Sequence, residues 1–235
     1  CVTGSGGNCE PDIAGNVYIQ SSRCDDDIER VKFGTSTDTT FDLRQLDCLT
    51  TAEKRKFVSN IYYVRDYAVT AGDGIPTLMR STFTLGSGAG AVPEHQAAVA
   101  LVEGIQAFRV ELGIDNRSKA YPGQSTGTPV DYTAAVQWLD PSTRTTPTNR
   151  GDGTPDGAFV HCTTVAPCSV NQLMNVTAVK VYLLARSREA DRGYTDNKTY
   201  QLGDEVLGPF NDGFKRHVYV ATMRIPNIAG RRQTP

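Results

Sequence analysis

The chain has 235 residues, which is enough to bury a sizeable core in one large domain. Its 24 basic and 26 acidic residues give a net charge of -2, so no overall positive field attracts nucleic acid or an anionic membrane surface. Hydrophobic residues make up 39% of the chain, which excludes a disordered protein, and the 22 glycines and 12 prolines indicate many loops. We therefore expect one folded domain over 1–235 without a nucleic-acid partner.

Residues 1–59 are expected to form a loop-rich region held together by disulfides. Gly, Ser, Asn and Asp dominate 1–27, where 16–20 is one short predicted strand, and apolar and charged residues alternate in 28–33, which predicts another. The pattern of 41–49 is ambiguous.

The clearest hairpin pattern follows. Residues 60–69 and 77–85 are both rich in β-forming side chains, and the glycines and proline of 71–76 provide a turn between them. A glycine-rich break at 86–91 ends this pattern. Residues 94–104 are predicted to form a helix, which Pro93 suits as a start.

The stretch 101–115 changes from a helical to a strand pattern. After Ala107 the apolar residues recur every second position, which predicts a half-buried strand. Two later runs, 176–186 and 216–228, are predicted to pair with it in a sheet. The predicted apolar face of the first strand carries Phe108, Val110, Leu112 and Ile114, and its predicted wet face carries Arg109 and Glu111.

Two long polar excursions, 116–157 and 187–212, separate these strands. Loops of this length are usually functional, disordered or specific decoration. Between them, Ser169 and Gln172 have the spacing of a capping box, which predicts one helical turn just before the strand that begins near Val176.

The six cysteines form no CxxC pair, and the three histidines lie far apart in the sequence. Both observations favour disulfides in an oxidising compartment over a metal site. The sequence leaves the pairing open. Proximity along the chain suggests Cys1 with Cys9, Cys24 with Cys48 and Cys162 with Cys168.

Two loops resemble ligand-binding motifs without matching them. The glycines of 86–90 lack the Lys-Ser/Thr of a phosphate-binding loop. Residues 149–157 resemble a calcium loop through Asp152, Gly153 and Asp156. However, Thr148 and Arg150 fall where carboxylates should stand, so a solvated turn is favoured.

Other motifs give no catalytic site. Arg150-Gly151-Asp152 is an integrin-like tripeptide, but matches of three residues arise by chance. His161 and Cys162 are adjacent, and adjacent strand residues point to opposite faces, so they do not form a nucleophilic pair. The carboxylates of 25–27 suit a solvated loop, and no G-x-S-x-G elbow occurs. We expect no enzyme activity, no cofactor and no metal.

Four segments carry a resemblance to a known family. In this order they resemble PilW-type minor pilins of bacterial type IV pili, which are related to the type II secretion pseudopilin GspJ. The match covers most of the chain from about residue 60. The segments are YYVRDYAVTAGDGIPTLMR (62–80), LVEGIQAFRVELGID (101–115), NVTAVKVYLLARS (175–187) and FKRHVYVATMRIPNIAGRR (214–232).

The resemblance implies an α+β, mostly β fold in which antiparallel sheets pack on a long N-terminal hydrophobic helix. No apolar run here approaches the ~18 residues that such a spanning helix needs, and the chain opens at Cys1 without a Met. We therefore expect an N-terminal segment to have been processed or left out. One apolar sheet face is then partly uncovered, or covered by a neighbouring element.

The implied function is that of a non-enzymatic minor pilin that joins a tip or priming complex and promotes pilus assembly. Its partners would be other minor pilins, the major pilin and a pilus tip adhesin. Before assembly it would be anchored in the inner membrane facing the periplasm, and afterwards it would be extracellular. Partner contacts are expected on 116–157 and 187–212. The alternative is a secreted adhesin or carbohydrate-binding module that is not part of a pilus.

Overall fold

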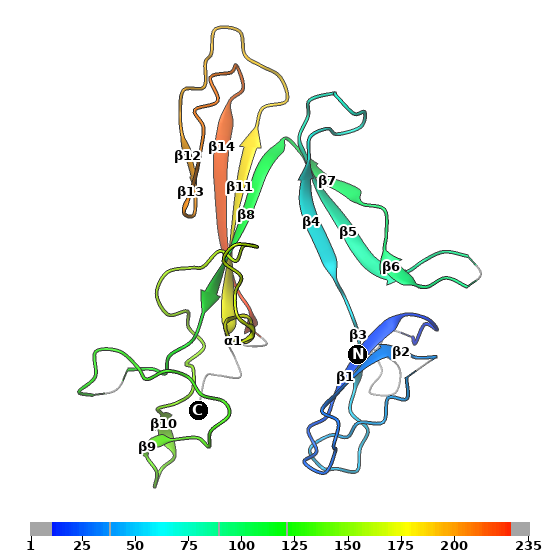
Figure 1. The fold of residues 1–235 in the computed structure, drawn as a ribbon, viewed down its shortest axis with the longest axis vertical. Coiled ribbons are helices and arrows are strands. Elements are labelled where there is room, and N and C mark those ends of the chain that lie inside the picture. Colours follow the sequence, from blue (N-terminus) through cyan, green and yellow to red (C-terminus); the bar gives the residue numbers. More distant parts are fainter. Residues whose placement is uncertain (1–10, 38, 89, 121, 227–235) are drawn as a thin grey trace. The chain divides into compact units, whose positions relative to one another are not determined.

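The computed structural model describes residues 11–226 except 38, 89 and 121 (Figure 1). It confirms the expected mostly β fold, because antiparallel strands account for nearly all of its regular structure. The chain divides into two compact units, Cys1–Glu103 and Gly104–Pro235. Each unit is described separately below, and the expectation of one domain over 1–235 stays a prediction.

The first unit begins with a small sheet in the order β2-β1-β3. Its strands are β1 (Val17–Ser21), β2 (Val31–Thr35) and β3 (Lys54–Lys56). Tyr18 and Gln20 of β1 are buried. The Gln20 amide donates to the Ala52 carbonyl (2.7 Å) and accepts from the Leu43 amide (3.0 Å), so this side chain ties the following loop to the sheet.

The second sheet of this unit contains the predicted hairpin. It consists of β4 (Asn60–Arg65), β5 (Thr77–Leu85), β6 (Pro93–His95) and β7 (Val99–Glu103), and β4 pairs antiparallel with β5 as predicted. In the turn between them, the Asp73 carboxylate accepts hydrogen bonds from four backbone amides. These amides, first that of Ile75, hold the pKa of Asp73 well below its usual range.

The predicted helix over 94–104 is wrong. This segment forms β6 and β7, which both pair with β5. A helix this short gains little stability by itself, whereas pairing with β5 gives its backbone groups partners in a sheet. Gly104, which has a φ of +81°, then ends β7 and begins the next strand, β8 (Ile105–Ile114).

The second unit is built on a three-stranded sheet in the order β14-β11-β8 (Figure 1). The middle strand is β11 (Val176–Arg186) and the outer partner is β14 (Arg216–Arg224). Both β8 and β14 pair antiparallel with β11. The pairing with β8 has two register shifts, and the pairing with β14 has none. The pairing of these three segments, predicted from their alternation, is confirmed.

Shorter elements complete the unit. They are β9 (Trp138–Asp140) paired with β10 (Thr145–Pro147), the helix α1 (Val170–Met174), and β12 (Tyr200–Leu202) paired with β13 (Glu205–Leu207). The predicted capping box is confirmed, since the Ser169 hydroxyl accepts from the Gln172 amide (3.2 Å). Within the described residues, no helix is long and apolar enough to cross a bilayer.

The assignment of the two faces of β8 needs correction. Glu111, predicted to face water, is only 5% exposed, because the core of the unit lies on its side of the sheet. This core consists of Tyr182, Leu184, Tyr200 and Leu202, so the hairpin β12–β13 covers the predicted wet face. The alternation set the two faces correctly, but it did not show which one is covered.

Candidate binding surface

The opposite face of the sheet is apolar, and the described residues do not cover it completely. The strand register sets its side chains in three cross-strand rows, none of which is fully buried. Tyr219 and Met223 are 56% and 53% exposed. We call these nine residues the apolar face: Leu112, Val179 and Met223; Val110, Val181 and Ala221; and Phe108, Leu183 and Tyr219.

An apolar face of this kind is unusual in an antiparallel sheet that faces water. Such sheets normally carry polar residues on the solvated side. Here β11 has apolar residues on both faces, with Tyr182 and Leu184 beneath the β12–β13 hairpin and Val181 and Leu183 on the apolar face. Contiguous exposed apolar surface marks an interaction site, so the apolar face is the candidate binding surface.

Charged residues hold the excursion 187–212 against the covered face of the sheet, which is the face beneath the β12–β13 hairpin. The side chains of Arg216 and Asp196 are both 0% exposed and form an ion pair of 2.8 Å. Arg216 also contacts both carboxylate oxygens of Asp212 (2.6 Å each) and stacks on the Phe210 ring (3.9 Å). The Tyr200 hydroxyl donates to Asp196 (2.9 Å). This cluster joins the excursion 187–212 to β14.

The pKa values follow from these contacts. Burial opposes the charged form of Asp196, but the hydrogen bonds from Arg216 and Tyr200 outweigh it and lower the pKa of this carboxyl. The hydrogen bond from Arg216 likewise lowers the pKa of Asp212. Burial, together with the hydrogen bond to Asp196, raises the pKa of Tyr200 to about 12. The carboxylates therefore stay ionised at neutral pH and hold Arg216 in place.

A second set of polar contacts, made by Glu111 and Arg109 of β8, holds the β12–β13 turn against the sheet. Glu111 accepts from the Tyr182 hydroxyl (3.1 Å) and from the Asp204 amide (3.3 Å). Arg109 pairs with Glu205 (3.1 Å) and with Asp204. The excursion 187–212 is therefore an ordered cover for one face, and its role as a partner-contact loop stays a prediction.

Hydrogen bonds to two carboxylates tie the calcium-like loop 149–157 to the end of β8. Asp115, fully buried at the end of β8, accepts from the Gly153 amide (2.7 Å). Asp156 accepts from the amides of Asn116 (2.8 Å) and Arg117 (2.7 Å). The segment forms a hydrogen-bonded turn, but it is not solvated as expected, because Asn149, Gly151 and Gly153 are buried. The carboxylates of Asp115 and Asp156 hold 149–157 against the strand end.

The Arg-Gly-Asp tripeptide is part of the same loop. The Arg150 guanidinium donates to the carbonyls of Ala134 (2.7 Å) and Asn149 (3.0 Å) and lies over the Tyr132 ring. Gly151 is buried against Asp115. Arg150 therefore stabilises the loop itself, and the interpretation of the tripeptide as a chance match stays a prediction.

The structure has disulfides between Cys24 and Cys48 and between Cys162 and Cys168, two of the three pairs suggested by proximity. The pair Cys1–Cys9 lies outside the described residues. His161 hydrogen-bonds through Nδ1 to the Val110 carbonyl (2.8 Å), so it does not pair with Cys162 as a catalytic base would.

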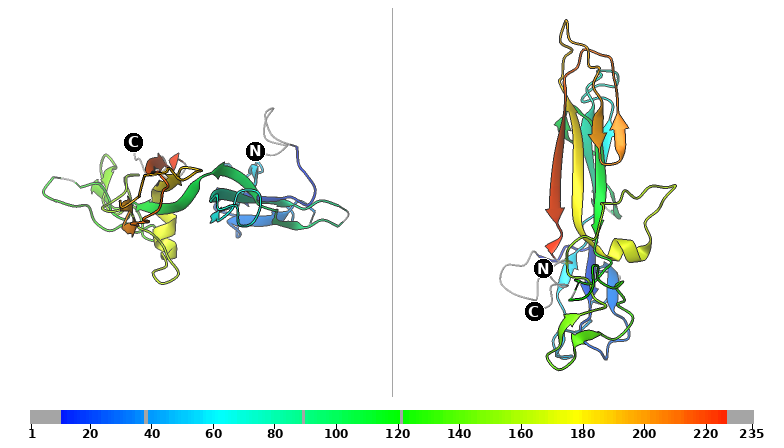
Figure 2. Two further views of the ribbon diagram at one scale, coloured as in Figure 1. Left: turned by 90° about the horizontal axis from the view of Figure 1, so that it is seen from above. Right: turned by 90° about the vertical axis from the view of Figure 1, so that its left-hand side faces the viewer.

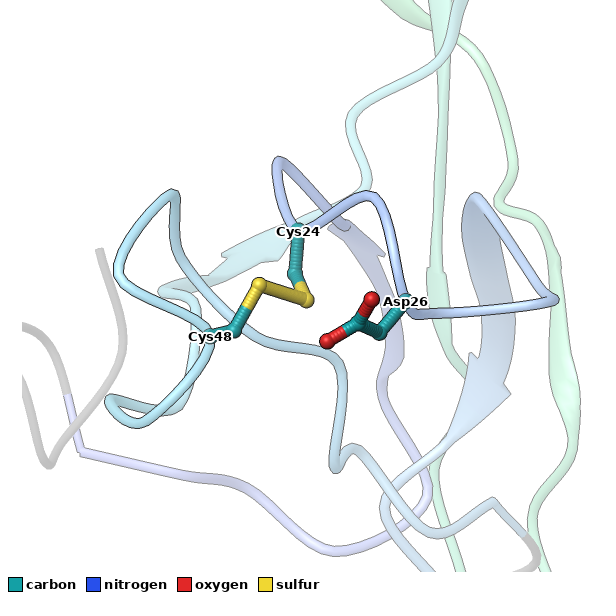
Figure 3. A group of neighbouring side chains, drawn as sticks. All are labelled: Cys24, Asp26 and Cys48. Carbon is teal, nitrogen blue, oxygen red and sulfur yellow. A yellow bond between two sulfur atoms is a disulfide. The ribbon is translucent and has the colours of Figure 1, made fainter.

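A metal site is not supported at the disulfide of the first unit. Cys24, Asp26 and Cys48 bring potential ligand atoms together, as Figure 3 shows. Both sulfurs belong to the disulfide and lack the thiolate that binds metals. The carboxylates of 25–27 are also not a cluster, because Asp27 instead pairs with Arg44 (2.7 Å). Of the described residues, Cys24 and Cys48 therefore serve as a structural disulfide.

Comparison with known proteins identifies one family. The model of a family described as type IV pilus-assembly protein W matches residues 61–227, which is most of the chain. No curated protein and no solved structure matches the chain. The matched range contains all three strands of the apolar face.

Proposed function

Because the chain belongs to the PilW family of type IV pilus-assembly proteins, we propose that it is a non-enzymatic minor pilin. In this role it joins a complex of minor pilins that primes filament growth and remains at or near the pilus tip. Its mechanism is surface complementarity between subunits, without a chemical step. The sequence resemblance and the family match support the same assignment.

The apolar face is the observation that carries this proposal. Neighbouring rows are two residues apart along the strands, so the distance between them is about 7 Å and the three rows span about 14 Å. Three rows therefore suit about two to three turns of an apolar helix lying along the sheet. We propose that the N-terminal hydrophobic helix expected in this family packs on the apolar face. We call this proposed contact area the helix seat, and Val181 lies at its centre.

The proposed location follows from the same assignment. The hydrophobic helix would anchor the protein in the inner membrane with the domain facing the periplasm, and would later pack in the filament. Disulfides such as Cys24–Cys48 suit this oxidising compartment. The proposed partners are other minor pilins and the major pilin.

Gene deletion and complementation with the full-length gene test the proposal. We expect deletion to lower the number of surface pili and twitching motility. Val181→Lys should fail to restore them, because a helix on the apolar face would have to bury the ammonium group. Pili are counted by electron microscopy, and protein levels are followed by immunoblotting.

Two variants serve as controls. Val181→Ile keeps the face apolar, and Leu173→Lys adds the same charge on the exposed side of α1, where Leu173 is 50% exposed. Both should restore pili. Unchanged pili in the deletion strain would contradict the proposed function. Normal pili with Val181→Lys would contradict the helix seat alone.

A further inference from the structure

Among the strands that the structure describes, the outer strand β14 leaves one edge of its sheet without a partner. It pairs with β11 over all nine of its residues, and its position in the order β14-β11-β8 is terminal. The right-hand view of Figure 2 shows it as the outermost strand of this sheet. No strand within the described range pairs with its other side. Its central residue Val220 is 52% exposed.

The hydrogen-bond pattern shows which backbone groups face this edge. The Ile225 amide donates to Thr177, and the Ser187 amide donates to Lys215, each at 2.8 Å. In an antiparallel ladder the residues alternate, so the odd-numbered positions from 217 to 225 bond to β11. The amides and carbonyls of Val218, Val220 and Thr222 therefore point away from the sheet.

Devices that normally protect an edge strand are missing here. Natural edges carry a central charge, a proline or a bulge. Between Arg216 and Arg224 the strand has no charged residue and no proline, and its register has no shift. The edge of β8 differs, because Leu112 forms a bridge with Val160 and the Val110 carbonyl bonds to His161. β14 thus presents an open template for strand pairing.

We propose that the edge of β14 accepts an extended strand from another pilus subunit, which would add to the sheet through its backbone. This inference rests on the proposed function. The incoming segment is an uncharged run of about five residues rich in β-branched and aromatic side chains. Its side chains on one face extend the rows that end at Tyr219 and Met223. Tyr and Met are residue types enriched in interface cores.

A second copy of the chain is the other candidate for this edge. Antiparallel pairing of two copies centred on Val220 sets Arg216 of each copy opposite Arg224 of the other. Asp196 and Asp212 already neutralise Arg216, so this register gives no charge argument against a second copy. We assign the edge to a different subunit because the proposed function places the chain in a complex of several pilins, and the crosslinking test below separates the two occupants.

The first test changes one outward-facing amide in the full-length protein in its own host. Val220→Pro removes a donor from the open edge and leaves the bonds to β11 intact, because proline is tolerated where its nitrogen faces outward. We expect about tenfold fewer pili, as the lost backbone bond weakens the complex. Val220→Thr keeps the amide and should assemble normal pili. Immunoblotting verifies equal protein levels.

A second test identifies the partner even if Val220→Pro folds poorly. Benzoylphenylalanine replaces Thr222, which is exposed on the face away from the helix seat, and the cells are irradiated. We expect a product with another pilin subunit, joined within an extended segment that mass spectrometry locates. The same group at Leu173 of α1 should not give this product.

The outcomes separate the two proposals. Normal pili with Val220→Pro, in a strain that needs the gene, would overturn the edge assignment and leave the proposed function standing. Crosslinking at Thr222 only to a second copy, or no crosslinking there, would also overturn it. Deletion of the gene without effect on pili would instead overturn the proposed function.

Discussion

Arg216 holds the second unit together through an ion cluster in which its own side chain and that of Asp196 are fully buried and that of Asp212 is half-buried. Its guanidinium contacts Asp196, Asp212 and Gln106 and stacks on Phe210. Two carboxylates face one cation, so the removal of Arg216 leaves buried or half-buried negative charge without its main partner. Breaking a buried ion pair on one side costs much more than the pair contributes.

We predict that Arg216→Met lowers the free energy of unfolding by about 3 kcal/mol at pH 7. Urea denaturation measures this loss. Arg192→Met, an exposed position in the same excursion, should change it by less than about 0.5 kcal/mol. Equal effects of the two variants would show that the cluster is not important for stability.

The same variant gives a pH dependence with a defined sign. Arg216 lowers the pKa values of Asp196 and Asp212 below their usual 3.8. A carboxyl whose pKa is lowered in the folded state contributes stability that is fully present above its usual pKa of 3.8. This contribution is lost as the pH falls below 3.8 and through the lowered pKa. In Arg216→Met the contribution is missing at every pH. We therefore expect the gap between wild type and variant to narrow from pH 7 to pH 3, and a constant gap would contradict the assignment.

These residues were not recognisable as a cluster in the sequence. Asp196 and Asp212 lie among turn residues, and Arg216 begins a predicted strand. Only the return of the excursion over the sheet brings them together. Asp73 differs, because its four amide donors come from its own turn. The Asp73 turn was predicted through its glycines and proline.

Among the elements, the hairpin β12–β13 depends on one glycine. Gly203 has a φ of +65°, and a Cβ atom there would lie 1.7 Å from Oε1 of Glu111. The residue therefore needs both an unusual backbone conformation and empty space. Since Glu111 also bonds to the Asp204 amide, the same carboxylate both positions the turn and limits its size.

We predict that Gly203→Ala destabilises the protein by about 2–4 kcal/mol, because it adds a steric clash to the backbone cost of about 1–2 kcal/mol. Gly193→Ala is the matched control. Gly193 has a φ of +87°, and a Cβ atom added there would meet nothing within 4 Å, so only the backbone cost applies. Thermal unfolding compares the two, and equal losses would argue against the contact with Glu111.

Element prediction succeeded where the pattern was local and failed where distant pairing decided. The hairpin β4–β5 and the strands β8, β11 and β14 all show alternation or β-rich runs next to turn residues. The segment of β6 and β7 has a helical spacing, but β5 offered it a partner. Alternation also found the apolar face and left its exposure open, because the distant hairpin β12–β13 decides which side of the sheet is covered.

On the scale of the whole molecule, the sheets and disulfides group by unit. Strands β1 to β7 lie in Cys1–Glu103, and β8 to β14 lie in Gly104–Pro235. Each unit contains one of the disulfides that the structure describes. The three strands of the apolar face all belong to the second unit. Both proposals therefore concern one unit, which carries the proposed helix seat and the open edge.

This grouping gives a test of the one-domain prediction. We expect the fragment 104–235, produced in an oxidising compartment, to unfold in one cooperative urea transition, because its sheet, its cover β12–β13 and the Arg216 cluster are all internal. Amide exchange should show slow protons in β11, the central strand. The matched control is the same fragment with Arg216→Met, which should unfold at a lower urea concentration. A fragment without a cooperative transition would instead favour one domain over 1–235, in which the sheet needs residues before Gly104 to fold.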